Sequence, residues 1–153
     1  MTYLISQIAE VLGAQVCGAQ EVPVSWLLTD SRSLCYPEDT LFFAIRSPRN
    51  DGHKYVEELY GRGVRAFVVE HLPEGDALHP DAVYLQVPSS LQALQALARH
   101  HRSRFSIPVV GITGSNGKTI VKEWLAALLR PSVRTTRSPR SYNSQVGVPL
   151  SVW

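Results

Sequence analysis

Hydrophobic residues along the chain follow two spacings, one typical of helices and the other of buried strands. Apolar positions three or four residues apart predict helices at 6–12, 55–60, 90–102 and 120–129. Continuous or alternating apolar runs bounded by turn residues predict strands at 22–28, 41–45, 64–69, 82–87 and 107–110, with a short one around Val133. Because strands and helices alternate, the expected fold class is α/β.

Capping and turn residues set the expected limits of these elements. Ser6 is expected to cap the first helix and Gly13 to end it. Ser89 or Ser90 is expected to cap the helix that ends near Arg102. Residues 29–33 and 46–53 are rich in Asp, Asn, Ser and Gly, which favour turns, so both are expected to be loops.

The segment Gly-Ile-Thr-Gly-Ser-Asn-Gly-Lys-Thr at 111–119 lies between a predicted strand and a predicted helix. This is the setting of a phosphate-binding loop, where glycines let backbone N–H groups turn inward and the helix start adds unpaired donors. Lys118 is placed to meet the β- and γ-phosphates, and the Thr119 hydroxyl to ligate Mg²⁺. Ile112 stands where the strict template has glycine, so the loop is a variant. A plain turn with a solvated lysine is the weaker alternative.

Composition indicates a globular protein with a buried core. The 153 residues are 44% hydrophobic and 18% charged, and no apolar run approaches the ~20 residues that a membrane span needs. The N-terminus lacks the basic segment of a secretory signal. Cys17 and Cys35 have no metal-type spacing and are expected to be reduced thiols, which favours a cytoplasmic location.

Charge is distributed unevenly along the chain. Residues 1–81 carry six Lys/Arg and twelve Asp/Glu, whereas residues 82–153 carry nine Lys/Arg and Glu123 as the one acid. A basic half can bind nucleic acid, but aromatic residues are not interleaved with the basic ones here. Because a phosphate-binding loop lies in the same half, polyphosphate ligands explain the charge better, and no nucleic-acid partner is expected.

The charge reversal and a break in periodicity predict a domain boundary near residues 102–106. Residues 1–102 are expected to form a first domain, and residues 103–153 the beginning of a second, incomplete one. A phosphate-loop domain needs several parallel strands, and too few residues follow Arg104 to supply them. We therefore expect the chain to be the N-terminal part of a longer protein.

Motifs in three parts of the chain resemble those of the Mur ligase family, the ATP-dependent amide-forming enzymes of peptidoglycan precursor synthesis. The first part is similar to the family's UDP-substrate domain and the second to its phosphate loop, while the third resembles the MurF type, which adds D-Ala-D-Ala. In order, these parts are 29–32 with 39–44 and 51–53; 113–119; and 122–123 with 142–150. Ile120 departs from the second threonine usual in the family, and Ser144-Gln145 depart from its common Asn-Glu.

The resemblance implies which residues bind which ligand. The UDP-sugar is expected to contact Asp30, Ser31, Arg32, Asp51, Gly52, His53 and Asn143. ATP is expected to contact Thr113, Gly114, Ser115, Asn116, Gly117, Lys118 and Thr119. Lys118 would be the catalytic residue, and Thr119 would hold Mg²⁺.

The resemblance also implies a reaction and its partners. The γ-phosphoryl group of ATP would pass to the terminal carboxylate of a UDP-muramoyl-tripeptide, and the amine of D-Ala-D-Ala would attack the resulting acyl phosphate. Some members of the family carry a fused alanine racemase domain, which here would lie beyond Trp153. The 153-residue chain alone is expected to be inactive in ligation.

Other interpretations remain open at the level of sequence. The chain could come from an amino-acid-adding ligase of the MurE type, from a phosphate-loop kinase or NTPase with an unrelated N-terminal domain, or from a nucleotide-sensing module. From spacing alone, Ser31 and Arg32 form a surface turn, and His53 is a capping or loop residue. His100-His101 has no third ligand at a useful spacing, so a metal site there is not expected.

Overall fold

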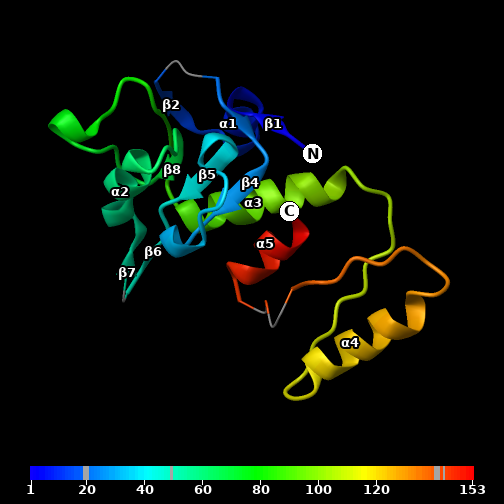
Figure 1. The fold of residues 1–153 in the computed structure, drawn as a ribbon. Helices are drawn as coiled ribbons and strands as arrows, with labels where there is room; N and C mark the ends of the chain where they lie inside the picture. Colours follow the sequence, from blue (N-terminus) through cyan, green and yellow to red (C-terminus); the bar gives the residue numbers. More distant parts are fainter. Residues whose placement is uncertain (19–20, 49, 140–141, 143) are drawn as a thin grey trace.

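A five-stranded sheet forms the centre of the computed structural model, which describes residues 1–18, 21–48, 50–139, 142 and 144–153 (Figure 1). Four neighbouring strands are parallel, and one edge strand is antiparallel to them. In spatial order the strands are β2 (Gln15–Cys17), β9 (Val83–Gln86), β8 (Ala66–Val69), β5 (Thr40–Phe43) and β4 (Trp26–Leu28). The fold is α/β, as predicted.

The central strands are apolar because the sheet is covered on both faces. All four residues of β5 and of β8 are buried, which explains their continuous hydrophobic sequences. Leu41 and Phe43 belong to the core on one face, while Phe42 and Phe67 belong to the core on the other. This division follows from the alternation of side chains along a strand.

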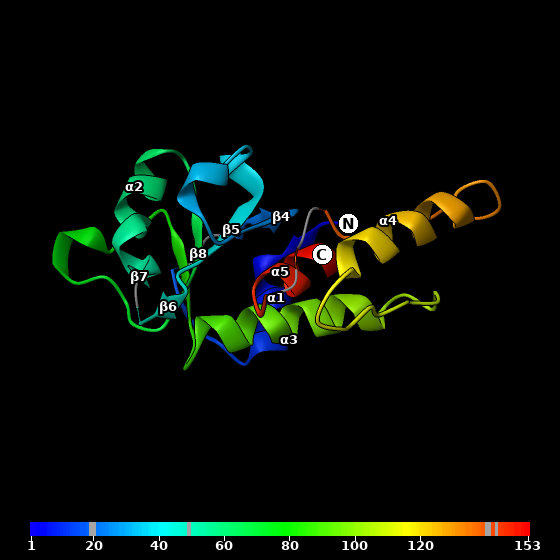
Figure 2. The same ribbon diagram turned by 90° about the horizontal axis from the view of Figure 1, so that it is seen from below.

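Two helices cover one face of the sheet and one covers the other (Figures 1 and 2). Helices α1 (Ile5–Leu12) and α3 (Ser90–Ser103) pack on the first core, and α2 (Val56–Gly61) packs on the second. Gly13 ends α1 in the left-handed conformation with φ 59°, and the Ser89 hydroxyl caps α3 by accepting from the Gln92 N–H. Both of these predictions are confirmed.

Short elements complete the body of the molecule. β1 (Tyr3–Leu4) pairs with β3 (Pro23–Val24), and β6 (Arg46–Ser47) pairs with β7 (Asn50–Asp51). Four 3₁₀ turns lie in the loops: η1 (Ser31–Ser33), η2 (Pro37–Asp39), η3 (Gly52–Tyr55) and η4 (Gly75–Ala77).

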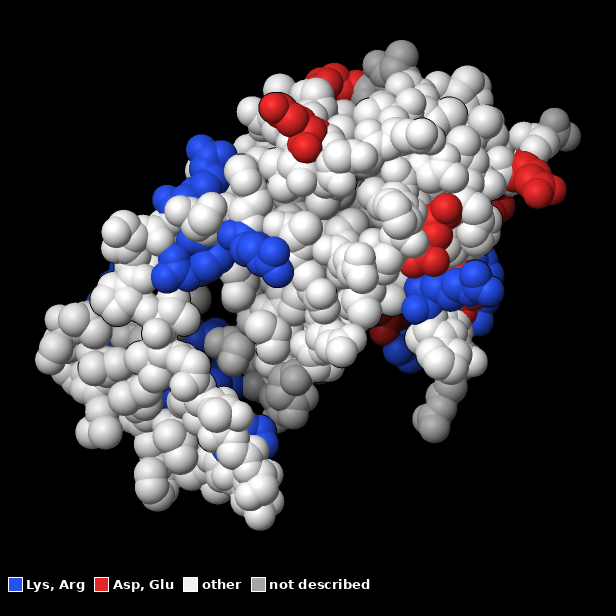
Figure 3. Space-filling view, turned by 180° about the vertical axis from the view of Figure 1, so that it is seen from behind, with Lys and Arg blue, Asp and Glu red and all other residues white. Residues whose placement is uncertain are grey.

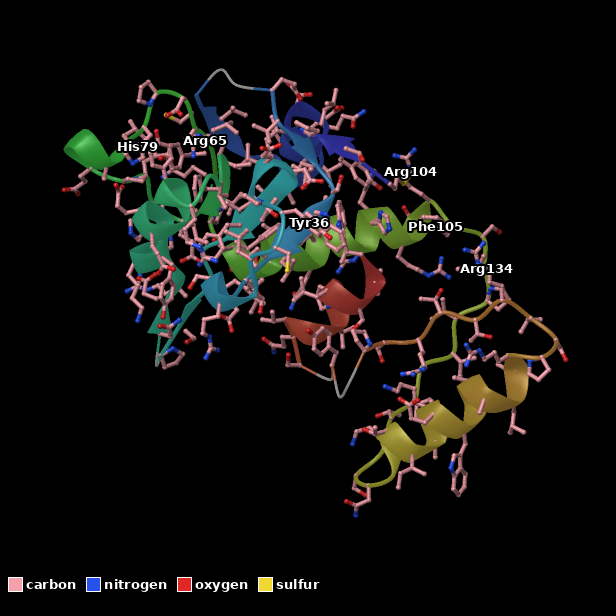
Figure 4. All side chains as sticks on the ribbon, in the orientation of Figure 1. Tyr36, Arg65, His79, Arg104, Phe105 and Arg134 are labelled. Atoms are coloured by element: carbon pink, nitrogen blue, oxygen red, sulfur yellow. The ribbon has the colours of Figure 1, made fainter. Side chains whose placement is uncertain are left out.

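Helix α4 (Lys118–Leu129), which follows the glycine-rich loop, stands apart from this body, whereas the last helix, α5 (Gly147–Val152), returns to pack beside α3 (Figures 1 and 2). No residue of α4 is buried, and the Trp124 side chain is 68% exposed. The chain leaves the body at Arg104 and Phe105, and Arg134 lies on the returning segment (Figure 4).

An aromatic cluster anchors the end of the chain to the body. The Trp153 ring lies 5.1 Å from the Tyr3 ring and 4.8 Å from the His101 ring, and its Nε1–H donates to the Ser25 carbonyl at 3.0 Å. His101 is buried, and this burial lowers its pKa. The Tyr3 hydroxyl lies 3.0 Å from His101 Nδ1, so the imidazole has a partner inside the cluster.

Several sequence expectations about elements were wrong. Residues 107–110 form no strand: Ile107, Val109 and Val110 are each at least 60% exposed, because no described strand lies beside them to share backbone hydrogen bonds. No strand forms around Val133 for the same reason. The predicted strand 22–28 is divided between β3 and β4, which belong to different sheets.

Other differences are local. Leu4, not Ser6, is the N-cap of α1, because the Ser6 N–H and hydroxyl both donate to the Glu21 carboxylate. Residues 46–53, predicted as a loop, contain the paired strands β6 and β7 and the start of η3. Strand β2 had no clear sequence signal because it is short and largely exposed.

Candidate functional site

The turn after β4 is held by its own side chains. Asp30 caps η1: its Oδ1 accepts from the Arg32 N–H at 3.1 Å and from Arg32 Nε at 2.9 Å, and its Oδ2 accepts from Arg32 Nη2 at 2.6 Å. The hydrogen bond from the Arg32 side chain is the main cause that lowers the pKa of Asp30. The Arg32 side chain is 87% exposed, so it can reorient towards an anionic ligand.

The loop after β7 is built around His53. Asp51 Oδ1 accepts from the His53 N–H at 3.0 Å and lies 2.6 Å from His53 Nδ1, while His53 Nε2 accepts from the Glu70 N–H at 2.9 Å. The hydrogen bond from the His53 backbone N–H is the main cause that lowers the pKa of Asp51. The His71 ring stacks on the His53 ring at 4.0 Å. Because both ring nitrogens are engaged, His53 orders the loop, and no general-base role follows from this geometry.

Gly52 allows this loop to approach the end of β5. A Cβ on Gly52 would lie 2.7 Å from the Ile45 nitrogen and 2.9 Å from backbone atoms of Ala44. The Gly52 N–H also donates to the Ile45 carbonyl at 2.9 Å. A glycine is therefore required here by close backbone approach.

Of the two loops that were predicted to contact a UDP-sugar, the first follows the parallel strand β4 at its carboxyl end, where ligands of open α/β sheets bind. The second follows the antiparallel strand β7 and lies against the residues at the carboxyl end of the parallel strand β5. Among the described residues, no hydrogen bond or ion pair joins Asp30, Ser31 or Arg32 directly to Asp51 or His53. Helix α2 links the two loops instead: it continues from η3, and its C-cap residue, Arg62, donates to the Ser31 carbonyl at 2.7 Å. Asn143 lies outside the described residues.

A depression of about 300 Å³ lies beside α2 and the residues that follow β8. Its lining includes His53 and Glu57 from the α2 side and His71, Leu72 and Glu74 from the other side. The depression therefore shares His53 with the loop after β7, and a ligand bound at that loop has space to extend over β8.

The glycine-rich loop is open and precedes α4. Gly114 and Gly117 have φ of 144° and 78°, and Gly117 is the N-cap of the helix. A Cβ on Gly117 would meet nothing within 4 Å, so its glycine is explained by backbone conformation alone. Lys118 Nζ bonds to the carbonyls of Gly114 and Ser115 within the loop. The lysine thus lies over the loop, where a phosphate group would meet it.

The remaining predicted nucleotide contacts surround this lysine in sequence. Thr113, Ser115 and Asn116 are exposed in the loop, and Thr119 is the second residue of α4. The loop lies at the start of α4, which stands apart from the sheet-containing body that carries η1 and η3 (Figure 1). The structure therefore groups the predicted ATP contacts and the predicted UDP-sugar contacts at two separate places.

The uneven charge of the sequence is visible on the surface. In Figure 3, both acidic and basic side chains appear over the sheet-containing body, whereas the face of α4 and its connecting segments that is in view shows basic side chains alone. Glu123, the one acid of residues 82–153, pairs with Arg137 at 2.9 Å and Lys122 at 3.2 Å. This excess of positive charge favours anions near the glycine-rich loop.

An α/β unit with two ordered loops is followed by a glycine-rich loop that opens a helix, an arrangement typical of proteins that bind nucleotides. No family model matches the chain. Over most of its length the chain is similar to curated ligases of the MurF type, which are members of the Mur ligase family. Among the described residues, no helix is long and apolar enough to cross a membrane.

These relatives are named UDP-N-acetylmuramoyl-tripeptide–D-alanyl-D-alanine ligase. The chain is 34% identical to that of Synechocystis sp. over 134 residues, 31% to that of Bacillus subtilis over 154 and 35% to that of Treponema pallidum over 153. The alignments cover 88%, 97% and 95% of the chain but 29%, 32% and 33% of the relatives. The chain therefore spans about a third of the length of these relatives.

Solved structures of MurF ligases have a fold similar to that of this chain. A MurF crystal structure from Acinetobacter baumannii has a TM-score of 0.88 at 24% identity, covering 99% of the chain and 33% of that structure, which supports the fold. MurF ligase from Thermotoga maritima in complex with ADP has a TM-score of 0.70 at 31% identity, covering 84% of the chain and 29% of that structure.

Sequence reasoning missed Arg62, Glu70 and His71. Arg62 contacts a residue 31 positions away, and Glu70 contributes a backbone N–H, so neither has a local signal. His71 is the second residue after β8. Its position just beyond the end of the predicted strand 64–69 is the signal that could have identified it.

Proposed function

We propose that this chain supplies the UDP-sugar-binding domain and the phosphate-binding loop of an ATP-dependent ligase that joins D-Ala-D-Ala to UDP-N-acetylmuramoyl-tripeptide. The observation that carries the proposal is the 31–35% identity to ligases of that name over 88–97% of the chain. The T. maritima relative in complex with ADP supports nucleotide binding at the glycine-rich loop. The pairing of two ordered loops with a separate phosphate loop fits one nucleotide-sugar and one nucleotide triphosphate.

The reaction needs activation because a carboxylate is a poor electrophile. ATP transfers its γ-phosphoryl group to the terminal carboxylate of the tripeptide and leaves as ADP. The D-Ala-D-Ala amine then attacks the acyl carbon, so that a C–N bond forms, the C–O bond to the phosphoryl group breaks, phosphate leaves with that oxygen, and the amine loses a proton. Lys118 would neutralise charge on the transferring phosphoryl group, and the N–H groups at the start of α4 would hold phosphate oxygens. The chain thus contributes position and charge, and no nucleophile.

The residues of this loop are compatible with a Mg²⁺ ion bound together with ATP. Thr119 carries a hydroxyl in the first turn of α4, next to Lys118, and Mg²⁺ commonly binds one or two protein oxygens together with phosphate oxygens. No group of three or more His, Cys, Asp or Glu able to hold a metal occurs in the part of the chain that the structure describes. We therefore propose that Thr119 would hold the ion with the phosphates. When bound, Mg²⁺ supplies further charge neutralisation.

A second candidate is an amino-acid-adding ligase of the same family. The chain is 36% identical over 130 residues to UDP-N-acetylmuramoyl-L-alanyl-D-glutamate–2,6-diaminopimelate ligase of Chlorobium phaeobacteroides. Both candidates bind a UDP-muramoyl peptide, so they share the role proposed for the first domain.

We further propose a cytoplasmic location, where both nucleotide substrates are made. A fused racemase domain, which would lie outside residues 1–153, stays a prediction.

We propose that a domain boundary lies near residues 102–106, with residues 1–102 as the first domain and 103–153 as the start of the second. In the part of the chain that the structure describes, residues 105–117 and 133–139, which flank α4, form no helix or strand and are largely exposed. Limited proteolysis is expected to cut there first and to leave a stable piece that ends after α3, with α5 retained through the Trp153 contacts. Equal protection across residues 102–117, with cutting inside the sheet, would contradict this boundary.

UDP-N-acetylmuramic acid is expected to bind the loops after β4 and β7. Titration into the ¹⁵N-labelled chain should shift the amide signals of Asp30, Ser31, Arg32, Gly52 and His53, because a diphosphate changes both local charge and hydrogen bonding. ADP serves as the control ligand: its binding to the open loop of this chain should be weak or absent, and any shifts that it causes should be confined to residues 111–119. If UDP-N-acetylmuramic acid shifts only residues 111–119, the first domain is not the UDP-sugar site, and a phosphate-loop kinase with an unrelated first domain becomes the better account.

A further inference from the structure

The turn at Asp30–Ser33 is held by hydrogen bonds within the turn and by one hydrogen bond from the end of α2. Asp30 holds it internally through its bonds to Arg32. From α2, Arg62 Nη1 donates to the Ser31 carbonyl at 2.7 Å. Ser31 is 5% exposed, so this charged donor meets a carbonyl of a residue that is largely removed from water. Hydrogen bonds from charged donors are stronger than those between neutral groups.

Arg62 is well placed to set the separation of the two loops. It is the C-cap of α2, and the other end of α2 continues directly from η3, which carries Gly52 and His53. The six residues of α2 span roughly 9 Å at 1.5 Å per residue. One end of this short helix is therefore joined covalently to the His53 loop, and the other end is bonded to the Ser31 turn.

We infer that Arg62 is a positioning residue for the UDP-sugar: it holds the Asp30–Arg32 turn at the distance and orientation from the Asp51–His53 loop that one ligand contacting both requires. This inference rests on the proposed function of the first domain. Arg62 acts through the Ser31 carbonyl and the backbone of η1, and it need not touch the ligand. Its contribution is preorganisation, because a turn that is already fixed loses less entropy when the ligand binds.

The same guanidinium makes a second contact that serves as an internal control. Arg62 Nη1 lies 3.1 Å from Glu58 Oε1, an i,i+4 pair with side chains 40% and 50% exposed. Exposed pairs of this kind add little to stability. Removal of Glu58 therefore leaves the bond to Ser31 in place, whereas removal of Arg62 breaks it.

Arg65 provides a control for charge. It lies three residues beyond Arg62, but its guanidinium bonds to Asp81 at 3.0 Å and to the Tyr60 carbonyl at 2.9 Å, on the side where His79 lies (Figure 4). Arg65→Gln and Arg62→Gln each remove one positive charge from the same end of α2. Only Arg62→Gln removes a donor to the turn.

The test is the dissociation constant for UDP-N-acetylmuramic acid, measured by calorimetry on the 153-residue chain, with amide hydrogen exchange of Ser31–Ser33 and the thermal midpoint as companion readouts. Arg62→Gln is expected to weaken binding about tenfold, the loss of one charged hydrogen bond, and to speed exchange in the turn. Arg62→Lys, which keeps a charged donor, should recover part of the affinity. Glu58→Gln and Arg65→Gln should stay within about twofold of wild type.

The outcomes separate this inference from the proposed function. If the wild-type chain does not bind UDP-N-acetylmuramic acid, the function of the first domain fails and the inference falls with it. If the wild type binds and Arg62→Gln binds equally well, only the inference is overturned. An equal loss of affinity in Arg62→Gln and Arg65→Gln would assign the effect to charge. An affinity loss that follows the thermal midpoint in every variant would assign the effect to folding. Either result also overturns the inference.

Discussion

Replacing Lys118 with alanine is expected to lower kcat by about 10²-fold or more in a ligase of full family length that contains residues 1–153. The reason is that Lys118 Nζ lies over the loop carbonyls of Gly114 and Ser115, where the phosphates of ATP would displace those contacts. The lysine charge then meets negative charge on the phosphoryl group as it transfers, so the loss falls on kcat as well as on nucleotide affinity. Steady-state kinetics of ATP-dependent ligation measures both.

Two companion substitutions make the Lys118 result specific. Arg130→Ala removes one exposed positive charge at the far end of α4, roughly 18 Å along the helix, and should leave kcat unchanged. Thr119→Ala should instead raise the Mg²⁺ concentration needed for half-maximal rate, because it removes the proposed protein oxygen ligand. Near-normal kcat in Lys118→Ala would show that residues 111–119 form only a turn between two elements.

The second large effect concerns the backbone approach at Gly52. Gly52→Ala is expected to cost about 2–3 kcal/mol of folding free energy, because the new Cβ would lie 2.7 Å from the Ile45 nitrogen and neither backbone can move without disturbing β5. For a chain of this size, such a loss lowers the thermal midpoint by roughly 5–10 °C. Chemical denaturation monitored by circular dichroism measures the free energy directly.

Gly61→Ala is the matched control. Gly61 is the last residue of α2, and a Cβ there would meet nothing within 4 Å, so alanine should stabilise the chain by about 0.5–1 kcal/mol. The two substitutions add the same methyl group and differ only in the space around it. A Gly52→Ala chain as stable as the wild type would contradict the close approach of η3 to the end of β5.

Local patterns were sufficient to predict most of the elements in residues 1–102. Strands such as β5 and β8 are apolar throughout because both sheet faces are covered, and Gly13 and Ser89 end and begin helices through their own backbone or side-chain chemistry. The glycine-rich loop was likewise recognisable from the order strand, loop and helix. In the structure that order is incomplete, because residues 107–110 have the composition of a strand but no described neighbour to pair with.

Contacts between distant parts of the chain could not be predicted. The bond from Arg62 to Ser31, the bond from the Glu70 N–H to His53 and the packing of Trp153 on Tyr3 each join residues that no periodicity relates. The resemblance to Mur ligases named Ser31 and His53 as ligand contacts. The structure shows which contacts hold these residues in place. Helix α2 links the Ser31 turn to the His53 loop, and His53 bonds to both Asp51 and the Glu70 N–H after β8.

The most direct measurement of the central claim is the product of ATP-dependent ligation by a full-length protein that contains residues 1–153. With UDP-N-acetylmuramoyl-tripeptide, D-Ala-D-Ala and ATP, the account predicts one UDP-N-acetylmuramoyl-pentapeptide and one ADP per turnover, both resolved by mass spectrometry. ADP formed without an amide product would contradict the ligase assignment. Addition of diaminopimelate to UDP-N-acetylmuramoyl-L-alanyl-D-glutamate, with no use of D-Ala-D-Ala, would contradict the MurF type.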